Sequence, residues 1–136
     1  MPAIATYAAM AFAAASPSAS PIDGLWFNPQ RTVLIRLAPC GEAMCGTVTW
    51  AAERAQQAAR KGADTLVGAR LLNDFRQSGN GQWRGTVFVA DMDVRVGGKI
   101  QVVDDNRLRV SGCILAGMMC RSQVWTRSGE ALSTRD

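Results

Sequence analysis

Four cysteines, arranged as two local pairs, are the first residues of this chain whose type and spacing suggest chemistry. Four residues separate Cys40 from Cys45, six separate Cys113 from Cys120, and no thiol is left over. Such spacing favours two disulfides, Cys40–Cys45 and Cys113–Cys120, in a protein that folds in an oxidising compartment. By chain entropy alone, each bridge would add about 2 kcal/mol to the free energy of unfolding.

The same sulfur atoms leave a second interpretation open, a site for a soft metal ion. Met44, Met118 and Met119 stand beside the cysteines, and thiolate and thioether sulfur suit Cu(I). The spacings are not those of a CxxC zinc site, however, and the chain contains no histidine. We therefore favour disulfides and expect no metal and no other cofactor.

Catalysis would have to use carboxylates, because histidine, the most frequent general base, is absent. Asp91 with Asp93, or Asp104 with Asp105, could share acid-base work. Acids in such positions are more often solvated turn residues. The sequence therefore favours a protein that is not an enzyme.

Composition indicates one folded domain of mildly basic character. The chain has 136 residues, of which 48% are hydrophobic and 19% charged, with 15 Lys and Arg against 11 Asp and Glu. A nucleic-acid binder usually clusters its cations with aromatic residues, whereas these arginines are spread along the chain. We expect no nucleic-acid partner, and anionic ligands or envelope surfaces are the alternative.

Residues 1–19 have the pattern of a secretory signal peptide. Their apolar run is too short to span a bilayer comfortably, and small residues allow cleavage after Ala15 or Ala19. Before this run the chain has no Lys or Arg, so an Ala-rich tail is the alternative interpretation. We expect an exported protein, periplasmic or secreted, that does not span the membrane after processing.

After residue 21 the sequence alternates between apolar and polar residues in short segments, which is typical of β-strands. The clearest of these segments are 31–38, 46–50, 83–89, 94–102 and 108–114. The pattern predicts an all-β domain over 22–129, with about eight strands in a small up-and-down antiparallel barrel, followed by a polar tail, 130–136. Residues 51–61, rich in helix formers, predict one short helix after the first hairpin.

The alternation also predicts which side chains face the interior. In the returning strand of the first hairpin, Gly46, Val48 and Trp50 share the inward face, and a further strand is expected over Leu66–Phe75. All four cysteines fall on outward positions, where the sulfur atoms of each pair could meet.

In the last strand, the outward position of Cys120 would turn Arg121 and every second residue after it inward. An arginine in the barrel cavity would suit an anionic head group, whereas a bulge after Cys120 would reverse the faces and leave Val124 inside. The candidate ligand-binding residues are Trp83, Arg121, Gln123 and Trp125.

Several motifs resemble the family called domain of unknown function 2147, a group of small exported bacterial proteins. The motifs are Gly24-Leu25-Trp26, Pro39-Cys40-Gly41, Cys45-Gly46, Gly68 to Phe75, Trp83, Leu108 to Cys113, Cys120 to Gln123 and Trp125-Thr126-Arg127. The resemblance implies a lipocalin-like barrel with an export signal, and it implies no particular activity. The chain departs from the family pattern at Ala51 to Ala63 and at Phe88 to Val94, so no site built from those segments is carried over.

Lipocalins also pair a Gly-x-Trp motif in the first strand with an arginine in the last, which Trp26 and Arg127 resemble. A guanidinium over an indole ring would join the two strands, so we expect a structural role for this pair. Taken together, the sequence predicts an envelope binding module of unknown ligand, holding a small amphipathic or anionic molecule in the barrel. The alternative is a structural or protein-interaction domain with a filled barrel.

Overall fold

Antiparallel strands close into one barrel, in which each strand pairs with the next and the last returns to the first. The computed structural model describes residues 20–114 and 119–128 of the chain. The strands in these residues are β1 (Gly24–Phe27), β2 (Val33–Cys40), β3 (Ala43–Ala51), β4 (Arg70–Gly79), β5 (Gln82–Val89), β6 (Val94–Asp104), β7 (Arg107–Ile114) and β8 (Met119–Arg127), and the helix α1 (Glu53–Ala58) follows β3. The predicted up-and-down barrel with a short helix after the first hairpin is confirmed.

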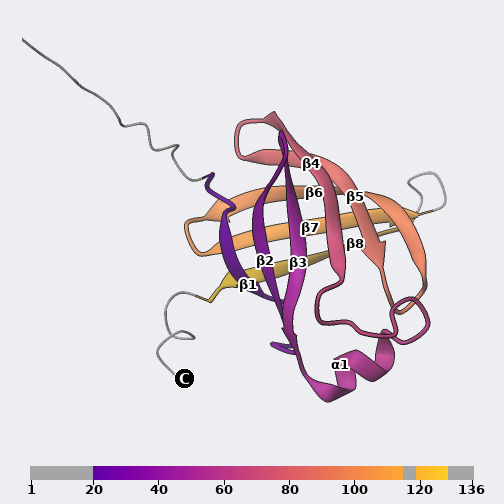
Figure 1. Ribbon diagram of the computed structural model, residues 1–136. Coiled ribbons are helices and arrows are strands. Elements are labelled where there is room, and N and C mark those ends of the chain that lie inside the picture. The colour runs from indigo at the N-terminus through magenta and orange to yellow at the C-terminus, as the bar shows by residue number, and fades with distance from the viewer. Residues whose placement is uncertain (1–19, 115–118, 129–136) are drawn as a thin grey trace, which may run out of the picture.

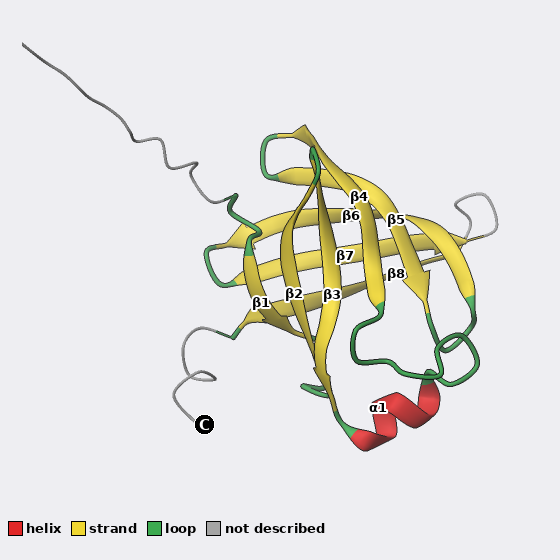
Figure 2. Cartoon of the chain, viewed as in Figure 1, coloured by secondary structure: helices red, strands yellow, loops and turns green. Residues whose placement is uncertain are grey.

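The sheet folds over on itself so that its two halves cross. In Figure 1 the strands β6, β7 and β8 run across the view behind β1, β2 and β3, which run from top to bottom. The helix α1 lies at the lower end of the barrel with the long connection to β4 (Figure 2). Ala59 and Leu66 of that connection join the hydrophobic core, so this segment covers the lower opening.

The interior of the barrel is filled by apolar side chains from most of its strands. Alternate residues point inward, which is the physical origin of the period-two pattern in the sequence. The largest fully buried side chains are Trp26, Phe75, Ile22, Ile35, Leu37, Leu72, Ile100, Leu108 and Val48. Removing a large member of this set would leave a cavity that the barrel cannot readily close.

A row of glycines on the inward face lets Phe75 pack directly against the backbone of the neighbouring strands. Gly85 on β5 pairs with Gly98 on β6, and Gly98 pairs with Gly112 on β7. A Cβ at Gly85 would lie 2.6 Å from Phe75 Cδ1, and one at Gly98 would collide with the Val87 side chain. Side chains are thus excluded from this row because the interior already occupies the space.

The inward position predicted for Trp50 is wrong, because β3 carries a bulge. Val48 pairs with Ile35 while Trp50 pairs with Leu34, so Thr49 is the extra residue. A bulge of this kind reverses the faces that follow it. Trp50 consequently lies on the outer surface, with 46% of its area exposed.

The strand predicted over Leu66–Phe75 is shifted along the chain. It begins at Arg70 and continues to Gly79, and its register with β5 is interrupted between Asn73 and Arg76. Asp74, within that interruption, has a positive φ of 58°. The predicted helix over 51–61 is also shorter, spanning Glu53–Ala58.

Some predictions fall outside the described residues: the signal peptide over 1–19, the polar tail over 130–136, and a contribution of Met118 to a metal site. Among the residues that are described, no helix has the length and apolar character needed to cross a membrane.

Candidate functional site

Trp26 and Arg127 form the predicted pair at the junction of β1 and β8. The guanidinium carbon lies 4.3 Å from the centre of the indole ring. Arg127 also donates hydrogen bonds to the carbonyl oxygens of Pro21 (3.0 Å), Asp23 (2.9 Å) and Asp105 (2.8 Å). Every nitrogen of this guanidinium therefore has a backbone partner, which indicates a structural role.

Both predicted disulfides are present. Cys40 is bonded to Cys45 across the first hairpin, and Cys113 is bonded to Cys120 across β7 and β8, with Cα–Cα distances of 5.8 and 4.0 Å. No free cysteine occurs among the described residues, and they contain no cluster of metal-ligating side chains. The cysteines of this part of the chain are thus accounted for as covalent bridges.

The candidate ligand-binding residues Trp83, Arg121, Gln123 and Trp125 differ in how far they are buried. The register of β7 with β8 runs without a shift, so Arg121, Gln123 and Trp125 do share the inward face. Trp83 and Trp125 are buried in the core, with 4% and 6% of their areas exposed. Their contact with a ligand remains a prediction.

Gln123 and Arg121 are exposed despite their inward position, because β1 is short. Within β8, only Thr126 and Arg127 pair with β1, so the first half of β8 has no paired strand on that side. The Gln123 amide oxygen accepts a hydrogen bond from the Trp125 indole at 3.0 Å. Of the four candidates, only Arg121 lines a hollow of the surface described next.

One hollow lies mainly on the outer face of β5 to β8 and has a volume of about 750 Å³. Most of its lining residues occupy outward positions, and the Cys113–Cys120 disulfide borders it. We call it the cationic hollow. Its lining residues are Arg84, Gly85, Gly97, Gly98, Lys99, Gln101, Arg109, Ser111, Gly112, Cys113, Cys120, Arg121 and Ser122.

The register of the strands brings several cations of this hollow side by side. Arg84 on β5 lies directly opposite Lys99 on β6, and Arg84 also faces Arg76 on β4. Like charges in directly opposite positions of a sheet destabilise it. Arg76 is compensated by the Asp74 carboxylate at 3.0 Å, whereas no acid among the described residues forms an ion pair with Arg84 or Lys99.

Ser111 lies near the middle of the cationic hollow. Lys99 faces it from β6, Ser122 faces it from β8, and Arg109 follows two residues along the same face of β7. Within residues 20–114 and 119–128, neither an ion pair nor a side-chain hydrogen bond engages these four side chains. The hollow thus gathers positive charge and hydroxyl donors that have no partner in the described protein.

The floor of the hollow is backbone rather than apolar side chain. Gly85 and Gly98, which receive Phe75 on their inner side, line it from within the sheet together with Gly112. A Cβ at Gly97, on the outer face, would meet nothing within 4 Å. None of the described lining residues is aliphatic or aromatic.

The carboxylate pairs considered for catalysis are solvated. Asp104 accepts hydrogen bonds from Arg107 and from the Asn106 amide, and the Arg107 hydrogen bond is the main reason that its pKa lies below the ordinary value. Asp91 and Asp93 are exposed in the turn between β5 and β6. Neither pair stands in a buried cleft.

Arg84, Lys99 and Arg109 were not singled out from the sequence. A partial signal existed, since each occupies an outward position of a clearly alternating segment. Their closeness depends on the relative register of β5, β6 and β7, which the sequence alone does not specify.

A closed antiparallel barrel with a first-strand tryptophan beneath a last-strand arginine defines a lipocalin-like protein. The structure is similar to that of protein HP1028 from the human pathogen Helicobacter pylori, which belongs to the lipocalin family, with a TM-score of 0.64 and 9% sequence identity over 82% of this chain and 85% of that chain. At this identity the likeness establishes the fold alone. The chain belongs to the family described as uncharacterized protein conserved in bacteria (DUF2147), which matches residues 24–127.

The predicted resemblance is therefore confirmed over nearly all of the barrel. Among curated proteins, no match to this chain is found. Neither the family nor the similar structure indicates an enzyme class.

Proposed function

We propose that this protein is an exported, non-catalytic binding module whose ligand is an anion held in the cationic hollow. The observation that carries the proposal is a set of four cations in one hollow whose described lining residues include no carboxylate, namely Arg84, Lys99, Arg109 and Arg121. The sequence favoured the inside of the barrel as the site, where Phe75 is among the fully buried side chains. The outer face offers the polar groups that the interior lacks.

Electrostatics gives a bound anion a clear energetic role. Arg84 and Lys99 repel each other across β5 and β6, and Lys99 is only partly exposed, so solvent screens it incompletely. An anion between them would replace repulsion by attraction and would stabilise the folded state through its binding. Arginine and serine both donate hydrogen bonds that suit charged oxygen atoms.

Export is part of the proposal. Two disulfides in a domain of this size suit an oxidising compartment such as the periplasm. A mildly basic protein in such a compartment would be attracted to anionic groups on the envelope surfaces around it.

Thermal unfolding in a series of anions tests the proposal. Sulfate or phosphate at constant ionic strength should raise the melting temperature of the protein, and a concentration of 100 times Kd corresponds to about 2.7 kcal/mol. The double variant Lys99→Gln/Arg109→Gln should lose this response. A variant that responds as the wild type does would contradict the proposed site.

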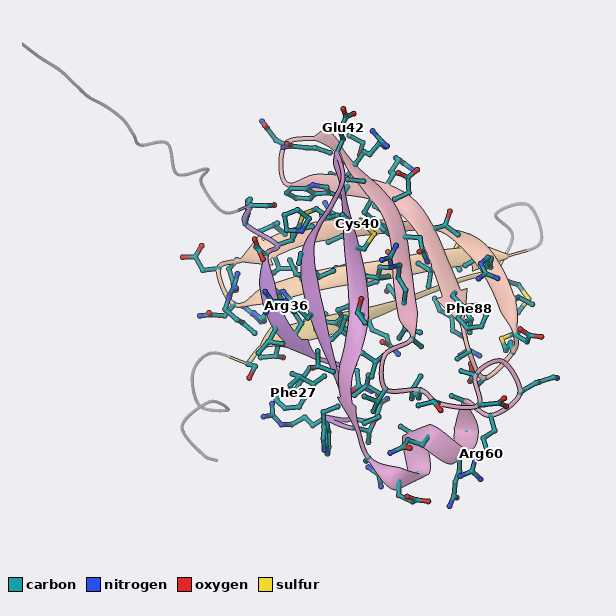
Figure 3. All side chains as sticks on the ribbon, viewed as in Figure 1. Phe27, Arg36, Cys40, Glu42, Arg60 and Phe88 are labelled. Atoms are coloured by element: carbon teal, nitrogen blue, oxygen red, sulfur yellow. A yellow bond between two sulfur atoms is a disulfide. The ribbon has the colours of Figure 1, made fainter. Side chains whose placement is uncertain are left out.

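Arg36→Gln is the matched control. Arg36 is an exposed arginine on β2, labelled in Figure 3, and it does not line the cationic hollow. Its removal lowers the net charge by one, against two in the double variant, and should leave the anion response unchanged. Equal losses in both variants would indicate a general charge effect.

A second candidate function, contact with an envelope protein, is favoured by the filled interior and by an exposed aromatic cluster. The Phe27 and Trp50 rings meet edge to face at 6.3 Å, and the Arg31 guanidinium lies 4.2 Å from the Phe27 ring centre. Exposed aromatic and arginine side chains are enriched at protein interfaces. Trp50→Ala should then abolish cross-linking to a partner in the intact envelope while leaving the anion response intact.

A further inference from the structure

We infer that the natural ligand of the cationic hollow carries at least two phosphate groups in series, so that the hollow is an oligophosphate site. This inference rests on the proposed function, since it specifies the anion that the same hollow binds. It is argued from the charge of the site, from its size and from the chemistry of its lining.

The charge of the site exceeds what a single phosphate group can neutralise. A phosphate ester carries a charge of about −1.5 to −2 at pH 7. Arg84, Lys99 and Arg109 contribute three positive charges on the outer face, Arg121 adds a fourth from the exposed inward face of β8, and the described lining residues include no acid. A diphosphate or longer chain matches this charge, whereas one phosphate group leaves about half of it unpaired.

The cations are also spread over the hollow rather than focused on one point. Arg84 and Lys99 lie in one cross-strand row, and Arg109 lies one row further along β7. Diagonal neighbours of this kind have Cα atoms about 7–8 Å apart. Arg121 lines the hollow from β8, opposite Gly112 and on the inward face, where it is exposed because β1 does not reach this part of β8. An extended anion can reach these positions together.

The volume supports the same conclusion. At about 750 Å³, the hollow falls within the size range of sites that hold organic ligands. A single tetrahedral oxyanion would displace only a few water molecules, each of about 30 Å³, and would leave most of the hollow to solvent.

The lining chemistry favours phosphate over other anions and indicates a polar ligand. A terminal phosphate group presents three acceptor oxygens, and the neighbours of Ser111 in the strand register are the donors Lys99, Arg109 and Ser122. A carboxylate offers only two oxygens in one plane. None of the described lining residues is aliphatic or aromatic, whereas four of them are cations.

Isothermal titration with defined anions tests this inference on the full mature domain. Orthophosphate, pyrophosphate, tripolyphosphate and citrate would be compared at equal ionic strength, without divalent cations. We expect Kd to fall at least tenfold from orthophosphate to tripolyphosphate, and we expect citrate to bind at least tenfold more weakly than tripolyphosphate. Lys99→Gln/Arg109→Gln should reduce tripolyphosphate binding at least tenfold, while Arg36→Gln should change it less than twofold.

The outcomes separate the two proposals. Equal affinity for orthophosphate and tripolyphosphate, or equal affinity for citrate and tripolyphosphate, would overturn the oligophosphate inference while leaving an anion site in place. Absence of binding by all four anions would overturn the proposed function as well. Ser111→Ala adds a variant that keeps the charge; unchanged tripolyphosphate affinity in this variant would contradict the donor arrangement around Ser111.

Co-sedimentation with vesicles identifies the source of the phosphate groups. Vesicles containing a diphosphate-bearing lipid would be compared with vesicles of equal charge that carry only monoester phosphate. Selective binding to the former, displaced by tripolyphosphate, would indicate a lipid-borne ligand. Tripolyphosphate binding with no preference between the vesicles would indicate a soluble one.

Discussion

Arg127 and the cations of the cationic hollow show two opposite ways in which this barrel uses positive charge. Arg127 is stacked on Trp26 and donates to three backbone carbonyl oxygens, so its charge is fully engaged within the protein. Lys99 and Arg84 instead lie opposite each other, and none of the described residues pairs with them. A cation that has a complete set of partners maintains the fold, and one that has none is available to a ligand.

The largest effect is expected at the ring beneath Arg127. Trp26 is fully buried, so Trp26→Ala should lower the free energy of unfolding by about 3–5 kcal/mol through loss of contacts and cavity formation. Chemical denaturation monitored by circular dichroism measures the change. Trp26→Phe is the control, and it should lower the free energy of unfolding by less because an aromatic ring remains beneath the guanidinium. Equal losses in the two variants would argue against a stabilising contact between the ring and Arg127.

Arg127→Gln should lower the free energy of unfolding by about 2 kcal/mol. The contact of the guanidinium with the Trp26 ring and its hydrogen bonds to backbone carbonyls are lost together. The carbonyls of Pro21 and Asp23 would then lose their partner, which loosens the chain before β1. Hydrogen exchange at the start of β1 should increase in this variant. Unaltered exchange there would show that Arg127 does not hold this segment.

Lys99→Gln should change the free energy of unfolding in the opposite direction. Removing one of two facing cations relieves repulsion, so without a binding anion the free energy of unfolding should rise by roughly 0.3 kcal/mol. Urea denaturation in a low-salt buffer free of phosphate and sulfate measures this. A loss of 1 kcal/mol or more would place Lys99 among the structural cations and would remove the contrast with Arg127.

The smallest effect concerns Asp104, whose pKa is lowered from the ordinary 3.8, chiefly by its hydrogen bond from Arg107. A lowered pKa in the folded state stabilises the protein above the unfolded-state pKa, and this contribution is lost as pH falls through the folded-state pKa. Asp104→Asn should therefore be slightly less stable than the wild type at pH 7, with the difference fading below about pH 3.8. Melting curves across this pH range test it, with Asp105→Asn as the control.

Period-two alternation was sufficient to predict the barrel, because each strand has one face toward the core. The local spacing of the cysteines was sufficient for both disulfides. Trp50 was misplaced because a bulge depends on the pairing of β2 with β3, and not on the residues of β3 alone. The cationic hollow escaped prediction for the same reason, since only the register across β5, β6 and β7 places Lys99 between Arg84 and Ser111.

The glycine floor of the cationic hollow has a kinetic consequence. Gly85, Gly98 and Gly112 are fixed from inside by the packed core, so the hollow is formed before any ligand arrives and has no lid among the lining residues. Ligands should therefore enter and leave without waiting for the barrel to open. Capture would be governed by diffusion and long-range attraction, and rising ionic strength should slow association far more than it speeds release.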